Sequence, residues 1–180
     1  QVSFKIQYRP NRWDEVGMIA GGTGFTPMLQ IIRHALTEPL YSNVEDRTKL
    51  SMLFCNRTEK HILLKGLFDK LAKDYPERFR MAYCVDNCIK PADWKGYKGY
   101  VTNEMIRETM PSPDCKNKMI MLCGPDHLLA HVAGTPMTPM HAMSSGNRPR
   151  QPVAPDLANL TSLGGVLAKC GYDNNDVFRF

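Results

Sequence analysis

A glycine cluster separates two apolar stretches near the start of the chain, in the sequence "GMIAGGTGFTPMLQII" (residues 17–32). Glycine tolerates positive φ and lets the backbone approach a ligand closely. Pro27 suits the first turn of a helix, because its missing N–H would have no partner there. A helix that starts directly behind a glycine turn presents unpaired N–H groups to an anion. The spacing therefore predicts a phosphate-binding turn of the kind that holds a nucleotide.

Two common phosphate motifs do not fit this turn. A P-loop continues with Gly-Lys-Ser/Thr, whereas Thr26-Pro27-Met28 follows here, which argues against a nucleotide triphosphatase. The Rossmann fingerprint needs a third glycine where Pro27 stands, and an acidic residue after the second strand, where the sequence is "CNR". The G-x-G piece alone is also compatible with a purely structural turn.

Four apolar stretches have the length and composition of buried strands, and "DVFRF" at the end of the chain has that of a fifth. The four are Gly17–Ala20, Leu50–Asn56, Phe79–Val85 and Met119–Cys123. Helical spacing of apolar residues lies between them, in Met28–Leu36, Ile62–Ala72 and Asn103–Thr109, the last capped by Thr102 or Asn103. Strands that alternate with helices predict an α/β fold, with a doubly wound five-stranded parallel sheet flanked by helices.

The chain is interpreted as one domain with a short segment before it. Residues 1–16 are assigned to the end of a preceding domain or to a linker, and residues 17–180 to the domain itself. Residues 133–156 are rich in Pro, Gly, Ser, Asn and Met without periodicity, so we expect a disordered or loop insertion there. Its methionines and histidine also resemble a Cu(I) site, but a linker explains the composition better. A helix is expected from Asp126, which could cap it, and another within "DLANLTSLGGVLAKCGY".

The longer motif G-G-T-G-x-T-P-M is far more specific than its glycines alone. It resembles the nicotinamide-nucleotide loop of the ferredoxin–NADP reductase superfamily, most closely that of the NADH–cytochrome b5 reductase family. "MLFCNRTEKHILLKGLFDKL" resembles that family's second strand and helix, "WKGYKGYVTNEMIRETMP" its Gly-aromatic-Val segment, and "MIMLCGP" its Cys-Gly-Pro turn. "VFRF" resembles the family's aromatic C-terminus. The resemblance implies a ferredoxin reductase-like NAD-binding domain.

The resemblance also implies an activity and a set of site residues. Enzymes of this family pass a hydride from NADH to FAD, and the flavin delivers single electrons to a haem protein such as cytochrome b5. By position, the residues next to the cofactors would be the following: Gly21, Gly22, Thr23 and Gly24 at the pyrophosphate and nicotinamide; Thr26, Pro27 and Met28 at the helix start; Cys123, Gly124 and Pro125 beside the nicotinamide; and Phe180 near the flavin. The role of Cys123 would be positional, because hydride transfer needs no thiolate.

The choice of cofactor is argued from charge at the end of the third strand, "YCVDNC". In this superfamily that segment lies near the adenosine, and NADPH users tend to place Ser-Arg there. Asp86 would repel a 2′-phosphate and could accept a hydrogen bond from a free ribose hydroxyl, which favours NADH. An ordinary aspartate turn after a strand remains an alternative, and Arg57 and Lys90 would weaken the preference.

Two departures from the family pattern keep other readings open. Asp126-His127-Leu128 stands where the family usually has Pro-Pro-Met, and R-x-Y-S/T, the family's FAD-binding motif, does not occur in the sequence. We therefore expect FAD to be bound mainly by an upstream domain and residues 1–16 to be its end or linker. The alternatives are a sibling flavoreductase module with another acceptor, such as that of nitrate reductase, and a nucleotide-binding domain that has lost catalysis.

Composition limits the partners and the compartment. The chain of 180 residues has a net charge of +5, without the basic and aromatic clusters typical of nucleic-acid binding. The charge is spread along the chain, as is usual for a solvated surface; a docking face for an acidic protein is the sharper alternative. We expect no membrane segment in this chain, because no apolar run approaches about 18 residues. Six cysteines without C-x-x-C spacing favour a reducing, intracellular location. The family is often anchored to the endoplasmic reticulum or outer mitochondrial membrane by an N-terminal segment, which we expect upstream.

Overall fold

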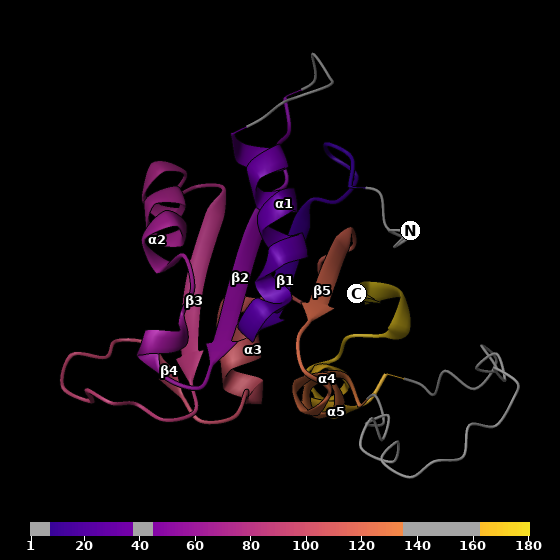
Figure 1. Cartoon of the computed structure of the whole chain (residues 1–180). Helices are drawn as coiled ribbons and strands as arrows, with labels where there is room; N and C mark the ends of the chain where they lie inside the picture. Colours follow the sequence, from indigo (N-terminus) through magenta and orange to yellow (C-terminus); the bar gives the residue numbers. More distant parts are fainter. Residues whose placement is uncertain (1–7, 38–44, 135–162) are drawn as a thin grey trace, which may run out of the picture.

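The computed structural model describes residues 8–37, 45–134 and 163–180. These residues form a six-stranded sheet in the order β4-β3-β2-β1-β5-β6, and every pair of neighbouring strands is parallel (Figure 1). The strands are β1 (Glu15–Gly21), β2 (Lys49–Asn56), β3 (Phe79–Val85), β4 (Tyr97–Lys98), β5 (Lys118–Cys123) and β6 (Val177–Arg179). The helices are α1 (Phe25–Leu36), α2 (Lys65–Asp74), α3 (Asn103–Thr109), α4 (Asp126–Ala133) and α5 (Gly165–Lys169), and three short 3₁₀ turns are η1 (Gly22–Gly24), η2 (Glu59–His61) and η4 (Asn174–Asp176).

The predicted doubly wound α/β fold is confirmed, but the sheet has six strands instead of five. The additional strand is β4, which pairs with the end of β3 through Cys84–Tyr97 and Val85–Lys98. Two residues are too few to produce an alternating apolar pattern, so the sequence carries no signal for it. β1 also begins two residues before the predicted start, and Trp13 already packs in the core at 6% exposure.

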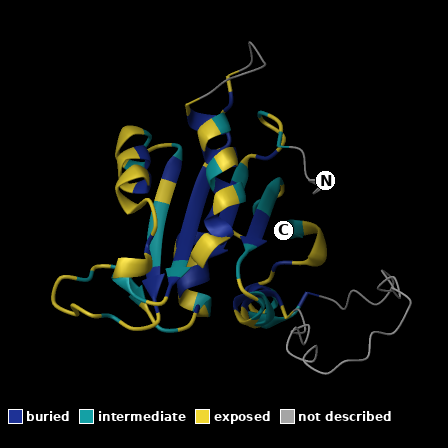
Figure 2. Ribbon diagram, viewed as in Figure 1, coloured by how far each residue is buried: buried dark blue, intermediate teal, exposed yellow. Residues whose placement is uncertain are grey.

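Each face of the sheet has its own apolar layer. Met18 pairs with Met52 in the register of β1 and β2, and both face the layer covered by α1 and α2. The next pair, Ile19 and Leu53, faces the opposite layer, which α3, α4 and α5 cover. Because both faces are covered, the central strands are continuous apolar runs and are buried along their length (Figure 2).

The start of one helix differs from the predicted one. The segment Ile62–Ala72 was expected to be helical, but α2 begins only at Lys65. Leu64 has φ +54°, outside the right-handed helical region, and is half exposed, as is Leu63. The apolar spacing is therefore misleading there, because only Phe68 and Leu71 of α2 are buried in the core.

The predicted helix caps have mixed outcomes. The Thr102 hydroxyl caps α3 by accepting the Met105 N–H at 3.3 Å, as one of the two predicted options. The prediction that Asp126 caps the next helix is wrong, because Asp126 is the first residue of α4 and Pro125 occupies the cap position. Gly164 is the N-cap of α5 and Gly165, at φ +63°, is its first residue, so the glycine pair lies at the start of this helix and does not interrupt it.

Some predictions fall outside the described residues. Ala133 and Gly134 end α4, and residues 135–156 of the predicted insertion, with their methionines and histidine, are not described. All six cysteines belong to described segments and are free thiols. None of the described helices has the length and hydropathy needed to span a bilayer.

Candidate functional site

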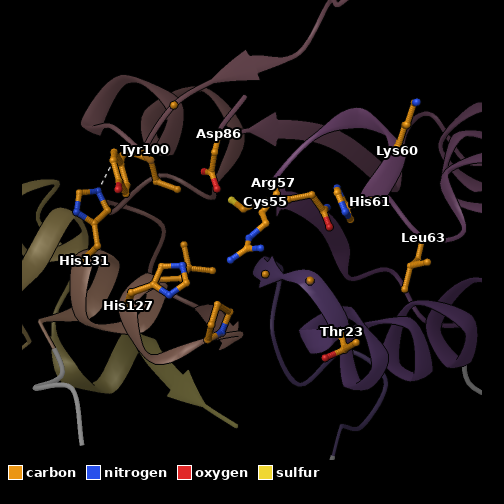
Figure 3. Close-up of a pocket in the computed structure, with 17 residues that line it drawn as sticks. Thr23, Cys55, Arg57, Lys60, His61, Leu63, Asp86, Tyr100, His127 and His131 are labelled. Atoms are coloured by element: carbon orange, nitrogen blue, oxygen red, sulfur yellow. Dashed lines mark hydrogen bonds between the residues drawn. The ribbon is translucent and has the colours of Figure 1, made fainter. Parts of the chain in front are cut away.

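A cavity of about 600 Å³ opens at the carboxyl ends of β1, β2 and β3 (Figure 3). The chain order of the strands reverses between β1 and β5, and such a switch point is where open parallel α/β sheets bind their ligands. The glycine turn after β1, the ends of β2 and β3, the segment before α3 and the first turn of α4 all contribute to the walls. The lining residues used below are Gly21, Gly22, Thr23, Asn56, Arg57, Lys60, Asp86, Tyr100, Pro125, His127 and His131.

The glycines of the turn have two different functions. Gly22 has φ +52°, and a Cβ there would meet no described atom within 4 Å, so this residue leaves the turn open toward the cavity. Gly24 does the opposite: a Cβ there would lie 2.2 Å from the carbonyl oxygen of Cys123. A Cβ on Gly21 would likewise lie 2.8 Å from Cδ of Pro125. The turn is thus packed directly against the Cys-Gly-Pro turn at the end of β5.

Helix α1 starts immediately behind the turn and points its N-terminus at this edge of the sheet. Its N-cap is Gly24, which has no side chain to satisfy the first N–H groups, and its first turn contains no acidic residue. Phe25 anchors this end of the helix by packing on Phe54 and Phe68, with ring centroids 5.5 and 6.0 Å away. The Phe25 N–H already donates to the Thr23 carbonyl, and Pro27 has no N–H. What this fixed helix start offers a phosphate is therefore mainly the positive end of the helix dipole.

Of the residues predicted for the site, five line the cavity: Gly21, Gly22, Thr23, Asp86 and Pro125. The others lie behind or beside it. Met28 is fully buried under α1, Thr26 is exposed and Pro27 is in the first turn of that helix. Gly124 packs against the backbone of Gly21.

Cys123 and Phe180 lie on the β5 side of the turn, outside the cavity wall. Burial raises the pKa of the Cys123 thiol above its usual value, so the group stays protonated at neutral pH. This agrees with a positional role. The Phe180 N–H donates to the Leu122 carbonyl at 3.0 Å, and its ring packs edge-on against Phe178 with centroids 5.0 Å apart.

The Asp86 carboxylate projects into the cavity from the end of β3 (Figure 3). Its backbone N–H donates to the Asn56 carbonyl at 3.0 Å, which fixes the loop after β3 against the loop after β2. Nearby, the Tyr100 side chain is 75% exposed, and the centroid of its ring lies 5.7 Å from that of His131. The His131 ring is positioned by a 2.7 Å hydrogen bond between its Nε2 and the Val101 carbonyl. A carboxylate beside an exposed aromatic ring can bind a ribose and an adjoining base.

Sequence reasoning missed several of these lining residues. Tyr100, Lys60 and His131 were not singled out, and Arg57 was considered only for its charge. Asn56 and Arg57 end the second predicted strand, so the rule that ligands bind at the carboxyl ends of parallel strands could have identified them. Nothing in the sequence shows that the Tyr100 ring is exposed.

Glu59 joins the loops after β2 and β3. Its carboxylate accepts hydrogen bonds from the Cys88 thiol at 2.9 Å and from the N–H groups of Ile89 and Lys90 at 3.0 and 3.1 Å. These donors lower the pKa of Glu59 to about 2, from an ordinary value of 4.5. Glu59 therefore holds the segment that carries Asp86 next to the segment that carries Arg57.

A Glu59→Gln variant should be less stable than the wild type at neutral pH, by an amount that depends on pH. Because the folded-state pKa is depressed, the stabilisation by the ionised carboxylate is present above the unfolded pKa and is lost as the pH falls through the folded value. The stability difference between the two proteins should thus be constant above about pH 5.5 and shrink as the pH falls toward 2. Urea unfolding at a series of pH values measures it; a difference that is independent of pH would contradict the assignment.

The comparisons with known proteins agree with this geometry. Residues 18–134 match the family described as "Oxidoreductase NAD-binding domain". The chain is 37% identical over 185 residues to NADH-cytochrome b5 reductase 2 of Coccidioides immitis, which covers 100% of this chain and 49% of that protein. It is 33% identical over 176 residues to the protein of the same name from Botryotinia fuckeliana, covering 98% of this chain and 44% of the relative. The chain thus spans about half the length of these relatives.

Two solved structures extend the comparison. The cytochrome b5 reductase domain of Ulva prolifera nitrate reductase superposes with a TM-score of 0.58 at 33% identity, over 65% of this chain and 42% of that one. The CS-b5R domains of human Ncb5or, in an NAD⁺ form, superpose with a TM-score of 0.59 at 19% identity, over 94% of this chain and 37% of that one. This likeness shows a shared fold. The chain belongs to the oxidoreductase NAD-binding domain family, with NADH–cytochrome b5 reductases as its relatives.

Proposed function

We propose that this chain is the NADH-binding half of a flavoenzyme like NADH–cytochrome b5 reductase, in which NADH supplies a hydride to FAD and a haem protein accepts the electrons singly. FAD would be held mainly by another domain. The observation that carries the proposal is the single cavity shared by the glycine turn, the Pro125 turn and Asp86.

The residues present fit a dinucleotide. Gly22 opens the turn at positive φ, and the N-terminus of α1, which is the positive end of its helix dipole, lies behind it, which suits a diphosphate. At one side of the cavity, Asp86 can accept a hydrogen bond from a ribose hydroxyl. On the other side, Pro125 and the first turn of α4 form a wall that would fix the nicotinamide and exclude water, with Cys123 behind it.

The proposal predicts saturable binding of one NADH per chain, weak in the absence of a flavin domain. Titration of the chain with NADH, followed by the change in NADH fluorescence, measures the affinity. ADP-ribose should compete, because it carries the diphosphate and both riboses. A chain that binds neither ligand at millimolar concentration would contradict the proposed function.

The electron acceptor needs a separate experiment with the chain joined to its flavin domain. Stopped-flow mixing with NADH and cytochrome b5 should show flavin reduction followed by haem reduction. Reduced flavin with oxidised cytochrome b5 would favour a sibling module with another acceptor, which the 33% identity to the nitrate reductase domain supports. Binding of NADH without flavin reduction would favour a domain that has lost catalysis; His127 in the cavity, in place of a family proline, is the observation behind that alternative.

A further inference from the structure

Arg57 lines the cavity and has no partner for its side chain among the described residues. It directly follows β2, and Figure 3 shows its side chain pointing into the cavity between Asp86 and His127. Within the part of the chain that the structure describes, its guanidinium makes no hydrogen bond or ion pair. By contrast, Arg78 donates to the Thr48 carbonyl at 3.0 Å and Arg47 pairs with Glu45 at 3.3 Å. An unpaired guanidinium aimed into a ligand cavity is a donor available to an anion.

The preceding residue, Asn56, offers a second donor at the same place. Asn56 is only 7% exposed and lines the cavity, yet its side-chain Nδ2 is buried without a hydrogen-bond partner among the described residues. Most buried polar groups in proteins are hydrogen-bonded, so this amide is a donor that an acceptor bound at the cavity wall would satisfy. Its backbone carbonyl is already used by the Asp86 N–H, which fixes the position of the residue.

The strand register places these two donors opposite the glycine turn. Gly21, the last residue of β1, is paired with Cys55 of β2, so Gly22, which follows β1, lies beside Asn56, the last residue of β2. Neighbouring strands are about 4.8 Å apart. A phosphate bound on the open side of Gly22 would therefore be within reach of the Asn56 amide and the Arg57 guanidinium.

We propose that Asn56 and Arg57 bind the diphosphate of the dinucleotide from the side opposite the glycine turn. This inference rests on the proposed function and names the residues that supply its missing charge: the turn GGTGFTPM contains no basic residue. Arg57 binds the phosphate oxygens with its planar fork of N–H groups, and Asn56 donates one further hydrogen bond. Lys60 also borders the cavity, but in Figure 3 its side chain extends away from Asp86 and Arg57.

The test compares ligands with and without the diphosphate. In the Arg57→Gln variant, the dissociation constants of ADP-ribose and NADH should rise about 10-fold to 100-fold, the usual effect of losing a hydrogen bond to a charged group. The affinity for adenosine, which lacks phosphate, should stay within about twofold of the wild type. The Asn87 N–H bonds to the backbone carbonyl of Arg57, and this contact survives the substitution. Isothermal titration calorimetry of the chain with each ligand gives these values.

Arg80→Gln is the matched control, because it removes the same charge from an exposed position on β3 that does not line the cavity. It should leave all affinities unchanged. Asn56→Asp removes the donor at nearly constant shape and should also weaken ADP-ribose more than adenosine; its thermal unfolding is recorded to confirm that it folds.

Three results would overturn the inference. Arg57→Gln could weaken adenosine and ADP-ribose equally, it could weaken neither, or it could weaken NADPH much more than NADH. The last result would assign Arg57 to the 2′-phosphate. A wild-type chain that binds neither NADH nor ADP-ribose would instead contradict the proposed function, so the two failures are distinguishable.

Discussion

A Gly24→Ala variant should unfold at a temperature at least about 6 °C below that of the wild type and lose nucleotide binding. The added Cβ would lie 2.2 Å from the Cys123 carbonyl oxygen, 2.5 Å from its carbonyl carbon and 2.8 Å from the Gly124 nitrogen. All three are backbone atoms, which cannot rotate away. Since the φ of Gly24 is an ordinary −63°, the effect is steric, and forced overpacking against backbone atoms costs about 3 kcal/mol.

Gly66→Ala is the matched control for this prediction. Gly66 is the second residue of α2, and a Cβ there would meet no described atom within 4 Å. Alanine is the better helix former, so this variant should be as stable as the wild type or more stable by up to about 1 kcal/mol. Thermal unfolding followed by circular dichroism compares the three proteins. Equal unfolding temperatures for Gly24→Ala and wild type would show that the two turns are not in contact.

An Asp86→Ser variant should lose most of its preference for NADH over NADPH. We expect the wild-type chain to bind NADPH at least about tenfold more weakly, because a carboxylate that faces a 2′-phosphate at a partly exposed site costs on the order of 1 to 2 kcal/mol. Serine removes the charge and keeps a hydroxyl that can bond to the ribose. The ratio of the two dissociation constants, measured by the same fluorescence titration, should therefore fall toward one.

Asp93→Ser removes an equal charge from an exposed residue outside the cavity, and its ratio should equal that of the wild type. Equal affinities of the wild type for NADH and NADPH would contradict the charge argument. Arg57 would then be the first residue to test, because its positive charge could offset the repulsion between Asp86 and the 2′-phosphate.

The sequence predicted the turn at the site better than the walls around it. Gly22, Gly24 and Pro27 have strong local preferences, so their pattern located the turn and the helix behind it. The position of β5 in the tertiary structure decides which glycine opens toward the cavity and which packs against Cys123. Local sequence does not contain that position. The motif resemblance was needed to bring these two segments together.

The misses have similar physical causes. The apolar run Ile62–Leu64 has helical spacing, but Leu63 borders the cavity and Leu64 is left-handed, so local periodicity gave the wrong helix start. The unpaired amide of Asn56 and the exposed ring of Tyr100 are results of packing. Both residues look ordinary in the sequence, because a residue's type does not reveal whether its polar atoms or ring face have found partners.

The separation of the two apolar layers has a consequence for how a ligand would act on the whole fold. Phe25, next to the glycine turn, is buried in the apolar layer under α1 and α2. Leu128, next to the Pro125 turn, is buried in the apolar layer on the other face of the sheet. A molecule that touches both turns is therefore linked by mass action to the integrity of both layers. Local unfolding of either layer would disrupt one of the two turns and so lose the free energy of ligand binding. A bound ligand should therefore reduce local unfolding on both faces of the sheet.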